Sequence, residues 1–344
     1  MEKTNKFGGF VKKNIVVVFL IILCIGFGVG TSDLFKTGNF SGIISSSTFL
    51  SASNIVNLTT QMAINAMLSA GLTYVIILGG IDISVGSVAA LAGIVSMLVA
   101  QKFPNVSILV ACLLLIASAI FVGAVCGGFN GLMITKFKVV PMIATLAMLQ
   151  MARGLCFVLS GGSSVFGVSN AYNWLGGGRL VTTEGKPTGW IPVITLFVIL
   201  CVFLMHMLLS KTVFGRHVYA TGSNRNVAHL SGINTNRVIF ISHIICAVMA
   251  SLGGVLNASK LQNGQPAACD GYEMYAIAAT VLGGTSLSGG RGSVGRAMFG
   301  AAIIAVINNG MNLMHINSYW QKFVIGVIIL LAVVLDMAQN KKKV

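Results

Sequence analysis

Acidic residues are scarce in this chain. Only 7 of its 344 residues are Asp or Glu, and charged residues of both signs make up 8% of the total. By contrast, 56% of the residues are hydrophobic, which is more apolar surface than a soluble domain of this length can bury. The composition therefore excludes an ordinary soluble protein and predicts a chain whose surface is partly covered by membrane lipid.

Several patterns typical of enzymes are also missing. The 7 cysteines are scattered without a CxxC pair, so neither a disulfide framework nor a zinc site is expected. The chain has no GxxxxGK[ST] loop for nucleotide phosphates and no HExxH motif. Gly290, Gly292 and Gly295 fit GxGxxG, but a dinucleotide fingerprint also needs a preceding strand in a soluble βαβ unit. We therefore expect a protein that is not an enzyme and binds no cofactor itself.

Long apolar runs are what the sequence has in abundance. A spanning helix needs about 20 mostly apolar residues. The runs predict an all-α integral membrane protein with about ten transmembrane helices, forming a single transmembrane domain over residues 1–344. The expected spans are 14–30, 60–79, 87–101, 108–134, 139–160, 191–209, 237–258, 275–284 with a continuation, 297–313 and 319–338.

The lysines and arginines predict the orientation of these spans. A net charge of +15 would also suit nucleic acid, but the basic residues form short clusters between apolar runs, which is the pattern that sets membrane topology. Their bias places both termini and the segment 210–236 in the cytoplasm, and we expect no nucleic-acid partner. The N-terminal lysines resemble the start of a signal peptide, but no A-x-A cleavage site follows, so a retained first helix is expected.

Small and polar residues suggest how the spans pack and what lies outside them. Gly123, Gly127 and Gly131 recur at every fourth position, which allows a neighbouring helix to approach closely. The outer segments 31–58 and 161–190 are rich in Ser, Gly, Asn and aromatic residues. These segments could form a docking surface for an extracytoplasmic partner, or they could be plain solvated connectors.

Polar residues within or beside the spans are candidates for a solute pathway. The stretches "LGGIDISVGS" (78–87) and "LGGTSLSGGRGSVG" (282–295) fit either broken helices along a pathway or gate, or tight cytoplasmic turns. Charged residues at membrane depth are functional suspects, although each could cap a helix or lie in a helix interface. Asparagines on one helix could bind a neutral polar solute or join two helices. The candidates are Asp82, Ser84, Ser87, Arg153, Gly283, Gly284, Thr285, Asn308, Asn309 and Asn312.

The scarcity of acids also bears on the energy source. Ion-coupled carriers usually place carboxylates or unwound carbonyls near the midplane, whereas the acids nearest the spans here (Asp82, Asp270, Glu273 and Asp336) are expected at span ends. An energy source other than an ion gradient is therefore expected. The polar stretch "GRHVYATGSNRNVAHLSGIN" (215–234) is a candidate for the contact with that source.

Within this stretch, the spacing predicts a short cytoplasmic helix. Asn224 can cap the helix, Val227 and Leu230 share one face, and Gly232 can end it. Such a helix suits docking into a groove on a partner, for instance an ATPase subunit. A merely solvated loop is the alternative.

Several stretches resemble the ribose-type membrane permeases of bacterial ATP-binding-cassette importers. The resemblance extends from about residue 50 to residue 336. The matching stretches are "GGIDISVGS", "FKVVPMIATLAMLQMARG", "GRHVYATGSNRNVAHLSGIN", "GYEMYAIAATVLGGTSLSGGRGSVG" and "NNGMNL" followed by "SYWQKFVIGVIILLAVVLD".

The resemblance implies a multi-pass permease of the bacterial inner membrane, in contact with lipid. It would be paired with a second permease, either another copy in a homodimer or a different permease chain. Its other partners would be an ATPase subunit that uses ATP and Mg²⁺ and an extracytoplasmic sugar-binding protein. The solute would be ribose or a related pentose or hexose. A nucleoside or sugar-derived signal is the alternative within the family, and an ion-coupled secondary carrier is the alternative outside it. The coupling residues expected in segment 210–236 are Gly215, Arg216, Gly222, Asn224, Val227, Ala228, Leu230 and Gly232.

The sequence departs from the usual pattern of similar permeases at a few positions. Tyr275 stands where they usually carry an aspartate, two residues after the glutamate of the "GYE" stretch. His229 stands where they usually carry an arginine, and the usual acidic residue near Asn226 is missing. The first departure bears on the identity of the sugar and on local ion pairing, and the second on the choice of ATPase partner.

Overall fold

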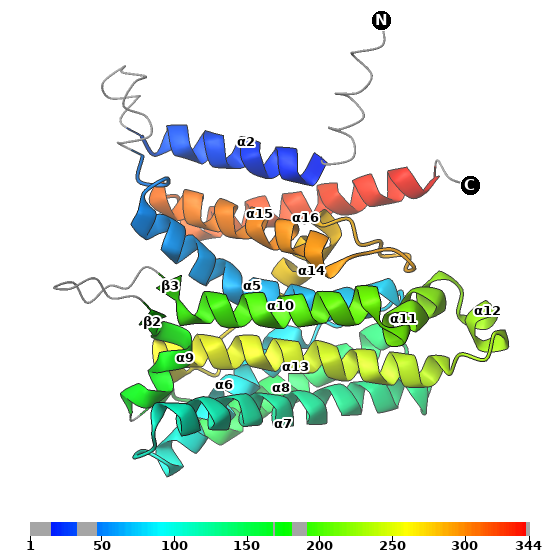
Figure 1. Ribbon diagram of the computed structural model, residues 1–344, viewed down its shortest axis with the longest axis horizontal. Helices are drawn as coiled ribbons and strands as arrows, with labels where there is room; N and C mark the ends of the chain where they lie inside the picture. Colours follow the sequence, from blue (N-terminus) through cyan, green and yellow to red (C-terminus); the bar gives the residue numbers. More distant parts are fainter. Residues whose placement is uncertain (1–14, 33–46, 168, 181–190, 342–344) are drawn as a thin grey trace, which may run out of the picture.

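The structure is a computed structural model that describes residues 15–32, 47–167, 169–180 and 191–341. Most of these residues form α-helices that run along the longest axis of the molecule (Figure 1). The longer helices are α2 (Ile15–Gly30), α5 (Ala52–Ile77), α6 (Val85–Lys102), α7 (Ile108–Thr135), α8 (Pro141–Ser160), α10 (Val193–Lys211), α11 (Val213–Ser223), α13 (Thr235–Leu261), α14 (Tyr272–Leu282), α15 (Val294–Leu313) and α16 (Ser318–Lys341).

Among the described residues, seven helices are long and apolar enough to cross a membrane: α5, α6, α7, α8, α10, α13 and α15. Each coincides with an expected span, although α5 begins at Ala52 rather than at residue 60. The first and last expected spans coincide with α2 and α16, whose apolar stretches are shorter, at Val16–Gly30 and Tyr319–Leu331. The expected span at 275–284 is the 11-residue helix α14, too short to cross alone. The all-helical membrane fold is confirmed.

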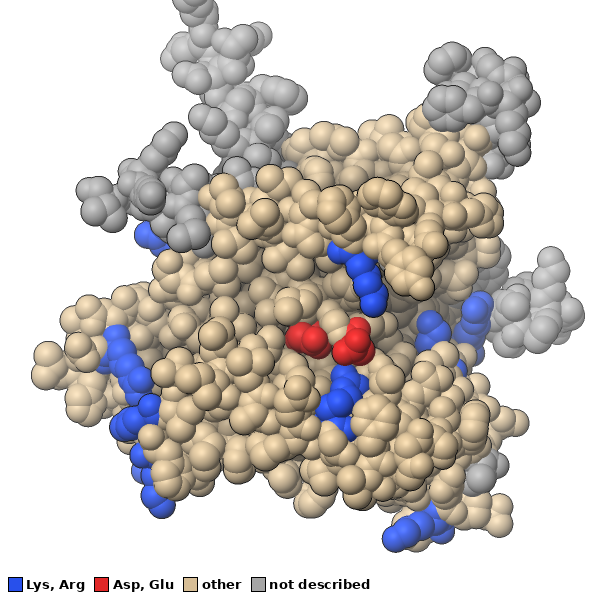
Figure 2. All heavy atoms as spheres, turned by 180° about the vertical axis from the view of Figure 1, so that it is seen from behind, with Lys and Arg blue, Asp and Glu red and all other residues tan. Residues whose placement is uncertain are grey.

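Large apolar side chains face outward along the helices at the periphery. Leu109 and Phe121 on α7 are 71% and 68% exposed, and Val158 on α8 is 75% exposed. Charged side chains are few on the broad face shown in Figure 2. The outward side chains of α7 and α8 suit contact with lipid, because they do not require water.

Helix α13 lies at the centre of the bundle, packed against α7, α6 and α5. The predicted glycine ladder explains the contact between α13 and α7. Gly123, Gly127 and Gly131 all face α13, and a Cβ on Gly127 would lie 2.6 Å from the carbonyl oxygen of His243. The prediction of close helix packing at these glycines is confirmed.

The two ends of the bundle differ in character. We call one the α12 end, after the short helix α12 (Arg225–Leu230), which projects beyond the other helices (Figure 1). Segments 78–84, 136–140 and 283–293 also lie there, and this is the end at which α2 begins and α16 finishes (Figure 1).

We call the opposite end the strand end, because short strands pair there. The strand β1 (Val165–Phe166) pairs with β4 (Asn263–Gly264), and β2 (Arg179–Leu180) pairs with β3 (Ile191–Pro192), both antiparallel. Between them lie a 3-10 helix, η2 (Asn170–Asn173), and the short helix α9 (Trp174–Gly177).

Part of the outer segment 161–190 packs onto the bundle. Tyr172 is buried and donates a hydrogen bond to the carbonyl oxygen of Phe103, at 2.9 Å. The backbone N–H of Gly176 donates to Ser259 Oγ at 2.9 Å. Residues 33–46 and 181–190 of the expected outer segments lie outside the described residues.

Candidate functional site

The most polar stretch of the chain folds into two helices at the α12 end. Asn224 caps α12, because its Oδ1 accepts hydrogen bonds from the N–H groups of Asn226 and Val227, both at 3.0 Å. Gly232 follows with φ +82, a left-handed conformation that ends the helix. The predicted capped helix is confirmed. The preceding part, for which the sequence analysis predicted no helix, forms α11, capped by Thr212.

Helix α12 presents an apolar surface outside the bundle. Leu230 is 86% exposed and Val227 is 57% exposed, whereas Ala228 between them is buried. Arg216 is exposed on α11, and Gly215 is buried where that helix begins. An exposed apolar pair on a short projecting helix is suited to a groove on a partner protein.

Helix α11 connects α12 to the bundle through close backbone contacts. A Cβ on Gly222 would lie 1.9 Å from the carbonyl oxygen of Ile77, at the end of α5, so only glycine fits there. The same carbonyl accepts a hydrogen bond from the N–H of Gly290, at 2.8 Å. The Tyr219 hydroxyl donates to the carbonyl oxygen of Gly292 at 2.9 Å, and burial raises the pKa of Tyr219, which favours this protonated donor. Helix α11, α5 and segment 283–293 thus meet at one junction.

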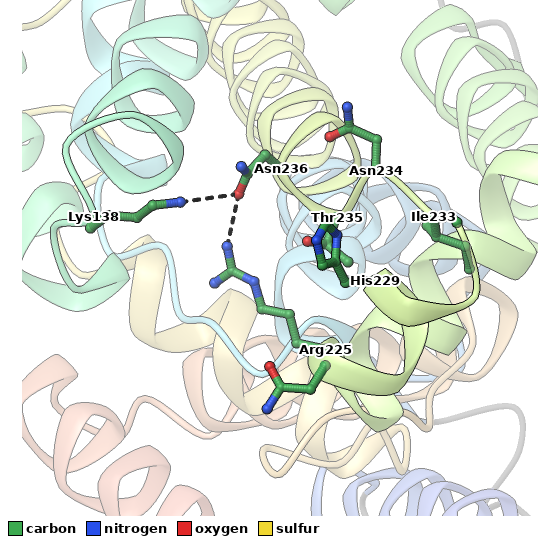
Figure 3. Close-up of a pocket in the computed structure, with 9 residues that line it drawn as sticks. Lys138, Arg225, His229, Ile233, Asn234, Thr235 and Asn236 are labelled. Atoms are coloured by element: carbon green, nitrogen blue, oxygen red, sulfur yellow. Dashed lines mark hydrogen bonds between the residues drawn. The ribbon is translucent and has the colours of Figure 1, made fainter.

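A basic pocket of about 710 Å³ lies beside α12. Lys138 Nζ and Arg225 Nη2 both donate to Asn236 Oδ1, at 3.4 and 2.9 Å (Figure 3). His229 also lines the pocket, and none of the described lining residues is acidic. The pocket therefore has a positive charge that is not neutralised within it.

The glycine-rich segment 78–84 is held by a buried carboxylate. Asp82 is fully buried, and its Oδ1 accepts hydrogen bonds from the N–H and Oγ of Ser84, at 2.9 and 2.6 Å. Asn130 on α7 donates to Ser84 Oγ at 3.2 Å. Asp82 therefore fixes the residue that precedes α6 and, through it, the contact with α7. Ser87 is buried one turn further along α6.

Arg153 ties α8 to the segment that precedes α14. Its Nη1 donates to the carbonyl oxygens of Pro266 and Ala268, at 2.6 and 2.9 Å. Gly283, Gly284 and Thr285 lie where α14 ends, and Gly284 has φ +83. Thr285 is fully buried.

Two of the three candidate asparagines on α15 join helices. Asn309 and Asn54 of α5 exchange amide hydrogen bonds of 2.9 and 3.0 Å. Asn312 accepts a 2.7 Å hydrogen bond from Gln321 of α16, and Asn308 is half-buried. These contacts favour the helix-joining interpretation for Asn309 and Asn312.

The predicted pathway residues do not form one cluster. Asp82 and Gly283 lie towards the α12 end, Arg153 lies within the bundle, and Asn309 lies towards the strand end. Asn130 was missed by the sequence analysis, although its position beside the glycine ladder was a usable signal. Among the described residues, no group of three or more His, Cys, Asp or Glu could hold a metal ion.

Comparisons with known proteins give the family. Residues 54–333 match the family model described as "Branched-chain amino acid transport system / permease component". The chain is 41% identical over 300 residues to the ribose import permease protein RbsC of Escherichia coli (strain K12), covering 86% of this chain and 88% of that one.

Other relatives agree. The ribose import permease protein RbsC of Bacillus subtilis (strain 168) is 40% identical over 315 residues, covering 89% of this chain and 94% of that one. The D-allose transport system permease protein AlsC of Escherichia coli (strain K12) is 32% identical over 302 residues, covering 87% and 88%. No solved structure matches the chain significantly. This chain therefore belongs to the same family as these bacterial membrane permeases of ATP-binding-cassette importers.

Proposed function

We propose that this chain is the membrane-spanning subunit of an ATP-driven importer for a monosaccharide, either ribose or a related pentose or hexose. The observation that carries the proposal is 41% identity to a ribose import permease across 86% of the chain. A 32% identical relative named for D-allose transport supports including hexoses among the possible solutes.

The α12 end is the cytoplasmic end in this proposal. Basic residues gather in its segments, and the positive-inside rule places such segments in the cytoplasm. These residues are Lys136, Lys138, Lys211, Arg216, Arg225, Arg237, Arg291 and Arg296. Both termini are cytoplasmic, because α2 begins and α16 finishes at this end (Figure 1).

The chain crosses the membrane about ten times in this proposal, with α14 and the segment before it making the eighth crossing. That segment runs beside α6 from Gly264, packed against Gly93, to Cys269, whose carbonyl oxygen lies against Gly86. Because this segment runs along α6, it adds to α14 the length that a membrane crossing needs. α2 and α16 make the first and last crossings.

A separate ATPase subunit docks on α12 and binds the ATP and Mg²⁺. The exposed side chains of Val227 and Leu230 enter a groove on that subunit, and the basic pocket beside them receives acidic side chains. ATP-driven closure moves α12, and the contact of Gly222 with Ile77 passes the movement to α5. Rearrangement of the spans then opens the solute path to one side at a time.

The strand end and the apolar sides of the bundle provide the surfaces for the remaining partners. An extracytoplasmic sugar-binding protein delivers the solute at the strand end. A second copy of this chain pairs with the first in a homodimer, and lipid covers the outward apolar side chains of α7 and α8.

Reconstitution tests the proposal. Vesicles that contain the permease, its ATPase and its binding protein should accumulate labelled ribose or allose only when ATP is present. Vesicles with the permease alone should not accumulate either sugar. Sustained uphill uptake by the lone chain, driven by an ion gradient, would contradict the proposal and favour a secondary carrier.

Deletion of Val227–Leu230 tests the docking surface. The deletion removes the exposed apolar side chains, so we expect loss of the ATPase from pull-downs with the purified permease. The matched control is Ser231→Ala. Ser231 is exposed, and among the described residues its hydroxyl bonds only to Val227, within its own turn. Stoichiometric ATPase binding together with full uptake by the deletion variant would show that α12 is not the docking element.

A further inference from the structure

Three charged side chains lie together where α14 begins. Asp270 lies three residues before Glu273, which belongs to the first turn of α14 and whose Oε2 lies against Gly86 of α6. Arg153 is held there by the carbonyl oxygens of Pro266 and Ala268. Figure 2 shows acidic side chains near the middle of one face, with basic ones close by.

The cluster lies well inside the depth of the bundle. At 1.5 Å per helical residue, Arg153 is about 18 Å from Pro141 and about 10 Å from Ser160, the two ends of α8. Glu273 Oε2 lies against Gly86, which itself belongs to a spanning helix. The expectation that Asp270 and Glu273 lie at a span end is thus corrected, because α14 begins inside the bundle.

Charge at this depth needs either a partner or water. Asp270 is exposed, and Arg153 and Glu273 are half-buried. No side-chain hydrogen bond to Asp270 or Glu273 occurs among the described residues, and those of Arg153 use Nη1 alone. Facing lipid would be unfavourable for these groups, so this surface must border a polar space.

A buried amide on α5 lies close to the start of α14. Ser69 Oγ donates to the carbonyl oxygen of Ala276 on α14, at 3.4 Å. Asn65 lies one turn before Ser69 on the same face of α5, which directs it at the first turn of α14. Asn65 is only 6% exposed, and its Oδ1 has no hydrogen-bond partner among the described residues. Asn65 thus adds a buried polar group behind the start of α14, covered by the bundle in this structure.

We propose that Arg153, Asp270 and Glu273 form a contact site for the hydroxyl groups of a neutral monosaccharide as it passes through the permease. This inference rests on the proposed function. The carboxylates accept hydrogen bonds from sugar hydroxyls, and the guanidinium donates to sugar oxygens. The rings of Tyr272 and Tyr275, 5.7 Å apart, add an aromatic wall.

The signs of the charges favour a neutral solute. Two carboxylates disfavour an anion, and the guanidinium beside them disfavours a cation. A polyol can use both signs at once, because every hydroxyl both donates and accepts. The solute therefore belongs to the class of uncharged sugars.

The test uses the complete transporter in vesicles, with labelled ribose and labelled allose as probes. Glu273→Gln and Asp270→Asn keep the side-chain size and remove the charge. In the double variant we expect the sugar moved per ATP hydrolysed to fall by about tenfold or more, the loss expected for hydrogen bonds to charged groups. ATP hydrolysis stimulated by the loaded binding protein, and assembly of the complex, should stay unchanged.

The matched control is Ser118→Ala on α7, because in the described part of the chain the Ser118 hydroxyl bonds only to Leu115 of its own helix. This control should transport like the unmodified protein. The inference is overturned if the double variant transports normally, or if its uptake, hydrolysis and assembly all fall together. Uptake by the unmodified transporter that depends on a sodium gradient would assign the carboxylates to a cation instead. Failure of the unmodified transporter to use ATP would overturn the proposed function itself.

Discussion

At the scale of single residues, neighbouring glycines on α7 differ completely in what surrounds them. A Cβ on Gly127 would collide with the backbone of α13, whereas a Cβ on Gly128 would meet nothing within 4 Å. Gly127→Ala should therefore destabilise the protein by about 1–3 kcal/mol through overpacking. Gly128→Ala should be neutral or slightly stabilising, because alanine favours a helix. Thermal unfolding in detergent measures both, and equal midpoints would contradict the α7–α13 contact.

Asp82 offers a second comparison at this scale. Its buried Oδ1 satisfies both the N–H and the hydroxyl of Ser84. Asp82→Ala leaves these buried donors unpaired and should destabilise the protein by about 1–3 kcal/mol. Asp82→Asn keeps an oxygen acceptor for both donors, so its loss of stability should be smaller. If the alanine variant unfolds at the same temperature as the asparagine variant, the hydrogen bonds of Asp82 do not hold segment 78–84.

At the scale of elements, the sequence predicted a helix correctly where the interactions that form it lie within a few residues. Asn224 and Gly232 predicted α12 because a cap and a left-handed terminator act within a few residues. The sequence analysis missed α11, since the glycines Gly215 and Gly222 weaken a helix by themselves. Those glycines are there for contacts with Leu209 and Ile77, and such contacts exist only in the folded bundle. Nothing in the sequence indicated that Arg153 lies beside Asp270 and Glu273, because that contact too exists only in the folded bundle.

The cap of α12 provides the prediction at this scale. Asn224→Ala removes the acceptor for two N–H groups and should destabilise α12 by about 1 kcal/mol. Hydrogen exchange of the α12 amides should then speed up, and the affinity for the ATPase should fall. Asn226→Ala is the control for hydrogen exchange alone, because that exposed side chain lines the basic pocket but makes no hydrogen bond with the described residues. Equal exchange rates in the two variants would show that the cap does not order α12.

At the scale of the whole molecule, the distribution of basic residues predicts which end faces the cytoplasm. Ser231 is exposed at the α12 end, and Ser163 is exposed at the strand end. In a variant without native cysteines, a membrane-impermeant thiol reagent added to intact cells should label Ser163→Cys and spare Ser231→Cys. Disrupted cells should label both. Labelling of Ser231→Cys in intact cells would reverse the orientation and move the ATPase site from α12.

Helix α5 joins the two ends of this architecture. It pairs Asn54 with Asn309 near the strand end, bonds Ser69 to α14 further along, and offers the Ile77 carbonyl to Gly290 at the other end. Its 26 residues form one uninterrupted rod of about 39 Å. A displacement of α5 at the α12 end would therefore also displace its strand end, because one continuous helix joins the two.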